Sequence, residues 1–500
     1  MNLTANQQKI IDTSGNLIVS ASAGTGKTHT MVAKISHELT NHKSHRVIAA
    51  ITFTIKAARE IKDRISVNTV GSFIGTNNSF VIEEVIKPFI KDVFGSKYGC
   101  DITTDYSLKF NKFDDGLAYI MYNGTLGSYL DSNKNFIFEL ALKILKRSEV
   151  ARLYLQAKYF KIYIDEYQDC DSTMSEFFMY LTDVLEIALF IVGDDKQSLY
   201  IWRGADPESF RKIINKESFT HIFMSENFRS NKQIQNYSNL LFTETASLYE
   251  PYNNLSSIVL LNCTSSDWGD KIKEILDENS SSALLRTRNK DAEATSSILG
   301  DDEILFKYIP SLPIDTISND SAWLYQSIAQ YIFLDTYSVY DFIYNIPMGT
   351  EDDSNLKRKL ENYLTKITLN QSDKKIFLEK VSDLAQFLGY NPQPKDLMLL
   401  YETISDFTYA DAFEQEKYKH RAMTCHSSKG LQFEQVIIFA EDFPLRNDDD
   451  FYKHYVAVTR AKRKLIIVDT NSYWAQKYKK KLSLEFAKYN LRIEDLLQIC

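Results

Sequence analysis

The segment Ala21 to Thr28, with the sequence Ala-Ser-Ala-Gly-Thr-Gly-Lys-Thr, constrains the fold more than any other part of the chain. It follows an apolar run at 16–20 and opens a helix-like stretch at 28–37, which is the strand–loop–helix order of a phosphate-binding loop. Small residues let backbone N–H groups curl around phosphate oxygens, Lys27 supplies a positive charge, and the Thr28 hydroxyl can hold Mg²⁺. Ala21 replaces the glycine that usually begins such a loop, and taken alone the segment could be an ordinary strand-to-helix turn. The predicted nucleotide contacts are Ala21, Ser22, Ala23, Gly24, Thr25, Gly26, Lys27 and Thr28.

A pair of carboxylates follows a second apolar run. Residues 162–164, Ile-Tyr-Ile, end in Asp165 and Glu166. Ligands bind at the carboxyl ends of the strands in a parallel α/β sheet, so carboxylates at this position can reach a bound nucleotide. We expect Asp165 to hold Mg²⁺ and Glu166 to polarise the attacking water. Two acids in a solvated turn would be the plainer interpretation, but the phosphate-binding loop earlier in the chain favours hydrolysis of a nucleoside triphosphate.

A third strand-like run, at 190–192, leads into a segment with both polar and aromatic residues at 193–205. Here Gln197 would place a neutral amide beside the phosphates. Tyr200, Trp202 and Arg203 form the aromatic and cationic mixture on which unpaired bases stack. A tryptophan is normally a core residue, and that interpretation would win for Trp202 in isolation. If both assignments hold, one segment touches the nucleotide and the nucleic-acid strand.

Composition limits the class of protein. The chain has 500 residues, which suggests about three or four folding units. Its 44% hydrophobic and 25% charged residues, without an apolar run of roughly 18, predict a cytoplasmic protein without a membrane segment. The five cysteines are far apart and suggest no metal site. A net charge of −8 counts mildly against nucleic-acid binding, although an acidic protein can carry a local basic stripe.

Together with further segments in the same order, these motifs resemble those of superfamily 1 helicases of the UvrD/Rep/PcrA type. The segments that carry the resemblance are 3–8, 51–58, 69–73, 165–169, 193–205, 226–230, 283–289, 423–433 and 455–462. Their number, length and order along the whole chain make the resemblance specific. It implies an ATP-dependent DNA helicase or translocase of 3′-to-5′ polarity, with ATP and Mg²⁺ as cofactors and DNA, single-stranded or with exposed ends, as partner.

The resemblance also assigns roles to single residues. It implies that Gln7 reads the adenine, that Phe228 packs against it and that Gln432 bonds the ribose. Arg229 and Arg460 would reach the γ-phosphate from across a cleft when the cleft closes. The catalytic residues are then Lys27, Glu166, Gln197, Arg229 and Arg460. The implied DNA contacts are Phe53, Thr54, Phe73, Tyr200, Trp202, Arg203, Thr424 and His426.

Five positions depart from the pattern of these helicases. His29 stands where arginine usually follows the loop, Gly71 replaces a frequent histidine, and Gln432 replaces a glutamate. Phe451 and Tyr452 take the places of two arginines in the last motif. None of these changes removes a catalytic group, so we expect an active ATPase and disfavour an inactive nucleotide-binding scaffold.

The expected fold class is α/β, with two RecA-like P-loop NTPase motor domains that each carry a mainly helical insertion. Apolar residues recur at helical spacing over 81–93, 136–158, 322–333 and 374–388. The first motor domain is expected at 1–75 and 155–222 with its insertion at 76–154, and the second at 223–315 and 415–500 with its insertion at 316–414.

The short chain leaves three functions open. Its size and layout resemble compact helicase subunits of the Gabija anti-phage type, which work with an ATP-gated nuclease of the OLD family; a stand-alone repair helicase is the other possibility. A protein of a different class, an ATPase that senses DNA ends and regulates a partner nuclease without processive unwinding, would need the same Lys27 and Glu166.

Overall fold

The computed structural model describes residues 3–99, 101–199, 204, 206–299, 305–317, 321–346 and 354–500. Tyr200, Trp202 and Arg203, which the sequence predicts to stack on bases, lie outside these residues.

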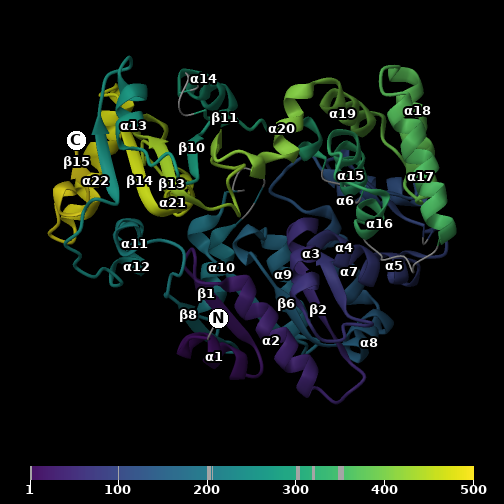
Figure 1. The fold of residues 1–500 in the computed structure, drawn as a ribbon. Helices are drawn as coiled ribbons and strands as arrows, with labels where there is room; N and C mark the ends of the chain where they lie inside the picture. Colours follow the sequence, from purple (N-terminus) through teal and green to yellow (C-terminus); the bar gives the residue numbers. More distant parts are fainter. Residues whose placement is uncertain are drawn as a thin grey trace.

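A six-stranded parallel sheet organises the first half of the chain (Figure 1). Its strands are apolar on both faces, as buried parallel strands usually are. Ile18, Ile51 and Ile164 belong to one apolar cluster. Val19 and Ala50 belong to another on the opposite face. In spatial order the strands are β3 (Phe73–Thr76), β2 (Val47–Thr52), β6 (Tyr159–Ile164), β7 (Ala188–Gly193), β1 (Leu17–Ala21) and β8 (Thr220–Met224).

Helices cover this sheet, and a further group of elements is inserted between β3 and β6. The insertion shares its apolar cluster with one face of the sheet, so the two parts have a common core. The covering helices are α1 (Ala5–Asp12), α2 (Lys27–Asn41), α3 (Ile55–Arg64), α9 (Ser172–Asp183) and α10 (Pro207–Ile214). The insertion consists of α4 (Asn77–Val81), a π-helical turn η1 (Ile82–Ile86), α5 (Lys87–Phe94), β4 (Thr103–Phe110), α6 (Phe113–Asn123), β5 (Thr125–Tyr129), α7 (Phe136–Arg147) and α8 (Glu149–Lys158).

A second parallel sheet, with seven strands, organises the other half. Apolar clusters again line both of its faces. Its strands, in spatial order, are β11 (Lys307–Tyr308), β12 (His420–Thr424), β10 (Ser282–Arg286), β13 (Phe433–Phe439), β14 (Ala461–Asp469), β9 (Ile258–Asn262) and β15 (Gln498–Ile499). Its helices are α11 (Lys232–Asn239), α12 (Thr243–Ala246), α13 (Trp268–Ile275), α14 (Asn289–Leu299), α21 (Asp448–Val458) and α22 (Tyr473–Ala487).

The second insertion is helical and has an apolar cluster of its own. It lies over the first half of the molecule, with α16 above α3 (Figure 1). Arg59 of α3 donates to the backbone oxygen of Asn345 at 3.3 Å, and the Tyr344 hydroxyl donates to Asp63. Its helices are α15 (Ala322–Phe333), α16 (Val339–Tyr344), α17 (Ser354–Leu369), α18 (Lys374–Phe387), α19 (Pro394–Ser405) and α20 (Ala410–Phe413).

The predicted α/β class, with one parallel sheet in each half of the chain, is confirmed by this architecture. Both sheets place the carboxyl ends of their strands where loops can carry a site. Within the described part of the chain, no helix combines the length and the apolar character that crossing a membrane requires.

Candidate nucleotide site and nucleic-acid face

The loop between β1 and α2 has the backbone geometry of an anion site. Gly24 and Gly26 have φ angles of 78° and 80°, in the left-handed region that favours glycine. Gly26 caps α2 without a side-chain hydrogen bond, so the first N–H groups of this helix remain available to an anion. A Cβ atom on Gly24 would lie 2.4 Å from the Asn227 Oδ1 atom, so the loop also has no room for a larger residue there.

The carboxylates after β6 lie against the start of α2. The Thr28 hydroxyl donates to Asp165 Oδ2 at 3.4 Å, and the Glu166 N–H donates to Asp165 Oδ1 at 2.9 Å. Burial, and then the charge of Glu166, raise the pKa of Asp165 to about 7. Burial also acts to raise the pKa of Glu166, but the ammonium groups of Lys429 and Lys27 outweigh it and leave that pKa below its usual value. Glu166 is therefore ionised, as a group that polarises water must be.

These residues fit a magnesium ion. A hydroxyl and a carboxylate oxygen are ligands that Mg²⁺ prefers, and this ion commonly takes few protein ligands beside phosphate and water. No group of three or more His, Cys, Asp or Glu side chains with metal-site geometry occurs among the described residues. Thr28 and Asp165 would hold the ion, and its charge would relieve the unfavourable ionisation of Asp165.

Asp194, at the end of β7, connects the phosphate-binding lysine to the predicted sensor glutamine. Its Oδ2 atom accepts from Gln197 Nε2 at 2.6 Å and lies 4.0 Å from Lys27 Nζ. Its other oxygen lies 2.8 Å from Lys196 Nζ. The structure thus brings Gln197 and Lys27 together at one buried carboxylate. Asp194 lies in the 193–205 segment, but its position in the sequence did not predict this role.

The two predicted arginine fingers lie beside this loop without a carboxylate partner. Arg229 donates to the Thr459 backbone oxygen at 3.1 Å, and its Nε atom is buried without a hydrogen-bond partner. Arg460 is 1% exposed and donates to the backbone oxygens of Val456 and Leu431 at 2.9 and 3.2 Å. Burial, and then the charge of Arg229, lower the pKa of Arg460. Among the ion pairs of the described residues, none involves either arginine, so a phosphate would be their natural counter-charge.

The predicted adenine contacts line one small pocket. The Gln7 amide donates to the Thr25 backbone oxygen at 3.2 Å, and its oxygen accepts from the Thr4 N–H at 3.0 Å. Phe228 is 57% exposed at the other side of the pocket. Gln432 is exposed and follows Leu431, whose carbonyl accepts from Arg460. The pocket residues are Thr4, Asn6, Gln7, Thr25, Met224, Ser225, Glu226 and Phe228.

The predicted DNA contacts are only partly brought together. Phe53 and the exposed Thr54 follow β2, and the Thr54 hydroxyl caps α3 by accepting from the Ala57 N–H at 3.1 Å. Phe73 instead pairs with Ala49, three residues before the end of β2 and thus about 10 Å from it. Its ring lies edge-on to that of Phe80, with centroids 5.2 Å apart, as expected of a packing residue.

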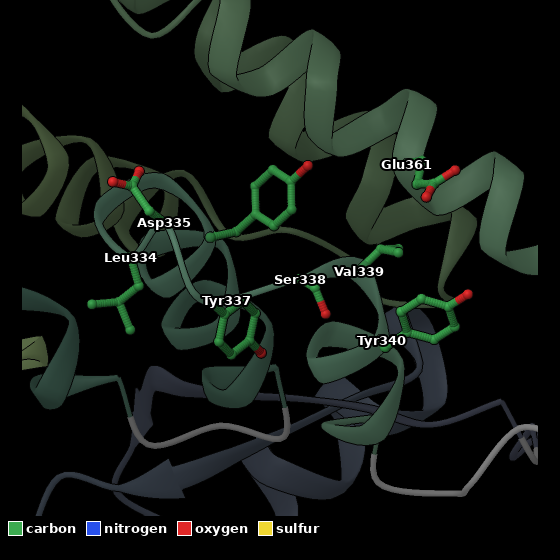
Figure 2. Close-up of a pocket in the computed structure, with 8 residues that line it drawn as sticks. Leu334, Asp335, Tyr337, Ser338, Val339, Tyr340 and Glu361 are labelled. Carbon is green, nitrogen blue, oxygen red and sulfur yellow. The ribbon is translucent and has the colours of Figure 1, made fainter.

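Two further predicted contacts follow β12 in the second sheet. The buried Thr424 hydroxyl lies 2.9 Å from that of Ser427 and shapes the turn, while His426 is half-buried. A separate hollow in the second insertion contains none of the predicted site residues (Figure 2). Its lining residues are Tyr331, Leu334, Asp335, Tyr337, Ser338, Val339, Tyr340 and Glu361.

Comparison with known proteins identifies two family domains. Residues 3–94 and 130–218 match the UvrD/REP helicase N-terminal domain, and residues 419–468 match the UvrD-like helicase C-terminal domain. The sequence is 40% identical over 478 residues to the Gabija protein GajB of Bacillus cereus (strain VD045), covering 94% of this chain and 96% of that protein.

Longer helicases match over a smaller share. The ATP-dependent DNA helicase Rep of Escherichia coli (strain K12) is 25% identical over 303 residues, which is 50% of this chain and 44% of Rep. The ATP-dependent DNA helicase PcrA of Staphylococcus epidermidis (strain ATCC 12228 / FDA PCI 1200) is 27% identical over 291 residues, which is 48% of this chain and 39% of PcrA. The resemblance predicted from the motifs is confirmed: the chain belongs to the UvrD-like family of ATP-dependent DNA helicases.

Proposed function

We propose that the protein is a motor that hydrolyses ATP between its two α/β halves and moves along DNA in the 3′-to-5′ direction. The observation that carries this proposal is the position of Arg229 and Arg460 beside the phosphate-binding loop, each without an ion-pair partner among the described residues. Arginines that reach a transferring phosphoryl group from another domain raise turnover by roughly 10³ to 10⁵ in other enzymes.

Within this site each side chain has one task. Lys27 binds the phosphates, Thr28 and Asp165 hold Mg²⁺, and Gln197 faces the γ-phosphate from its bond to Asp194. Bound Mg²⁺ would neutralise phosphate charge. Glu166 orients and polarises the attacking water, and its depressed pKa keeps it ionised for this task.

The nucleic-acid strand would cross the loops at the carboxyl ends of β2 and β12. Phe53, Thr54 and His426 are the predicted contacts with accessible surface at these two edges. Because one edge belongs to each half, a change in the spacing of the halves would change the distance between two grips on the strand. Nucleotide-dependent closure then gives movement along the strand.

A second candidate function is favoured by the extent of the match to the Gabija protein GajB, which covers nearly the whole chain, whereas Rep and PcrA match over about half of it. In this candidate the chain is a subunit of an anti-phage complex. It would sense DNA ends and use ATP to regulate a partner nuclease of the OLD family, with little processive unwinding.

The decisive experiment measures ATP hydrolysis by the purified chain without DNA and with single-stranded, blunt duplex and 3′-tailed duplex DNA. Strong stimulation by single strands, together with unwinding of the 3′-tailed duplex, is the result expected of the motor. Stimulation mainly by duplex ends without unwinding would support the end-sensing candidate. A 5′-tailed duplex unwound in preference to the 3′-tailed one would contradict the proposed polarity.

A further inference from the structure

A tyrosine from the second half accepts a hydrogen bond from the predicted phosphate-binding loop of the first. The Ala23 N–H donates to the Tyr455 hydroxyl at 3.0 Å, and this hydroxyl donates to Asp194 Oδ2 at 3.3 Å. Tyr455 and Ala23 are each 1% exposed. The hydroxyl therefore uses its proton and one lone pair in a bridge between the phosphate-binding loop and the turn after β7.

We propose that Tyr455 is a positioning residue that holds the phosphate-binding loop and yields the Ala23 N–H to a phosphate oxygen when nucleotide binds. The inference rests on the proposed ATP site. The loop needs its N–H groups to cradle phosphates, so a tyrosine bound to one of them competes with nucleotide for it.

The carboxylate beside Tyr455 strengthens this interpretation. Asp194 Oδ2 lies 4.0 Å from Lys27 Nζ, so one oxygen faces both the tyrosine and the phosphate-binding lysine. The Tyr455 hydroxyl and the Asp194 carboxylate thus supply oxygens to the same N–H and ammonium groups that phosphate oxygens would contact. The pair substitutes for a phosphate.

A second tyrosine on the same face of α21 is linked to the same turn through Arg211 of α10. Tyr452 precedes Tyr455 by three residues, a spacing that puts both on one side of a helix. Its hydroxyl accepts from Arg211 Nη2 at 2.6 Å, and Arg211 Nε donates to Asp195 Oδ2 at 2.8 Å. Two hydroxyl groups therefore attach α21 to the 194–197 turn of the first half.

The helix that carries these tyrosines also positions an arginine finger. Arg460 follows α21 directly and donates to the backbone oxygen of Val456, the residue after Tyr455. Displacing the Tyr455 hydroxyl therefore moves the backbone that holds the Arg460 guanidinium. Nucleotide entry and arginine placement are coupled through one helix.

The test compares the wild-type protein with Tyr455→Phe, which keeps the ring and removes the hydroxyl. The matched control is Tyr325→Phe, in the buried α15 helix of the second insertion. Without nucleotide, we expect faster hydrogen exchange at residues 22–24 in Tyr455→Phe. With Mg²⁺ and a non-hydrolysable ATP analogue, we expect about two- to tenfold tighter binding, because the competing hydroxyl is gone. The control should change neither quantity.

A second measurement needs no variant. In the wild-type protein the analogue should change hydrogen exchange across 448–458, because Tyr455 on α21 loses its bond to the Ala23 N–H as the halves close on the nucleotide. Unchanged exchange in this segment, or unchanged exchange at 22–24 together with unchanged or weaker analogue binding in Tyr455→Phe, would overturn the proposal. Failure of the wild-type protein to bind the analogue at all would instead overturn the proposed ATP site, so the two failures are distinguishable.

Discussion

The positive charge of Lys27 is the one that the predicted nucleotide site places in the phosphate-binding loop. Its ammonium group lies 4.0 Å from Asp194, and its side chain is 11% exposed at the start of α2. We expect Lys27→Ala to reduce ATP turnover by about 10²-fold or more, because no other described lysine takes its place in the loop. Steady-state ATP hydrolysis with single-stranded DNA checks this. Lys477→Ala, on the exposed side of α22, is the matched control and should leave turnover unchanged.

Substituting Arg460 separates the effect on nucleotide binding from the effect on ATP hydrolysis. Arg460→Ala should lower DNA-stimulated turnover by roughly 10³-fold while nucleotide affinity changes little, since an arginine finger acts mainly on the transition state. The measurement pairs steady-state hydrolysis with equilibrium binding of a non-hydrolysable analogue. Arg460→Lys keeps the charge but loses the bonds to two backbone oxygens. An equal loss of nucleotide binding in Arg460→Ala would mean that the arginine supports the fold.

The sequence indicated the residues expected to touch the nucleotide better than the residues that hold them in place. Gln7, Arg229 and Arg460 lie in motifs of fixed order, and the structure places all three around the loop of 21–28. The role of Asp194 could not be predicted in the same way. Its contact with Lys27 depends on β7 lying next to β1, a neighbour relation that spacing along the chain does not contain.

At the scale of single elements, α21 is tied to the second sheet by a buried polar chain. The Tyr478 hydroxyl lies 2.9 Å from His454 Nε2 and 2.6 Å from the Tyr237 hydroxyl, which joins α21 to α22 and α11. Burial lowers the pKa of His454 from 6.5 to about 3. The folded protein therefore keeps this imidazole neutral at pH values where the unfolded chain binds a proton.

Because the pKa of His454 is lowered in the folded protein, the free energy of unfolding decreases as the pH falls. The contribution of His454 is fully present above pH 6.5 and is lost as the pH falls toward about 3. Between about pH 7 and pH 5.5 the wild-type protein should lose about 1 kcal/mol of unfolding free energy more than His454→Gln does. Urea unfolding at the two pH values measures the difference. Equal pH dependence of both proteins would contradict the buried neutral imidazole.

The predicted helices differ in how closely their bounds agree with the structure. Apolar spacing predicted a helix over 322–333, and α15 has these bounds. The helix expected over 136–158 is broken at Ser148, whose hydroxyl accepts from the Ala151 N–H at 3.1 Å and caps α8. A serine inside an amphipathic pattern is compatible with a continuous helix or with a helix cap. The turn of the chain toward β6 favours the cap.

At the scale of the whole molecule, one ion pair joins the halves beside the catalytic carboxylates. Lys429 Nζ lies 2.7 Å from Asp169 Oδ2, and the aspartate side chain is 1% exposed. Lys429→Met leaves that carboxylate buried without this partner, and we expect a cost of about 3 kcal/mol. The halves should separate, giving a larger radius of gyration in small-angle X-ray scattering.

The double variant Lys429→Met/Asp169→Asn provides the control for that prediction. Burial raises the pKa of Asp169 to about 6, so a neutral amide in its place avoids the charge penalty. We expect the double variant to recover most of the stability and compactness lost in Lys429→Met. A double variant as expanded as the single one would show that Lys429 acts through other contacts.

The relation between the insertions and the sheets was the least predictable feature. Helical spacing identified apolar stripes in both insertions but not the surfaces that bury them. The first insertion shares its core with the first sheet, whereas the second has an apolar cluster of its own and reaches α3 through Tyr344 and Asn345. Which surface buries each apolar stripe depends on contacts between segments that are distant in the sequence. Local periodicity carries no information about those contacts.

The course of the backbone between the two sheets has a consequence for engineering. All strands of the first sheet lie between 17 and 224, and all strands of the second between 258 and 499, so the chain joins them by one covalent connection at 225–231. Cutting there severs no strand of either sheet. Two separately produced fragments, ending and beginning in this connection, should associate through the Lys429–Asp169 and Tyr455–Ala23 contacts and regain ATPase activity by complementation. The enzyme could then be switched on by mixing, with Arg460 delivered as part of the second polypeptide.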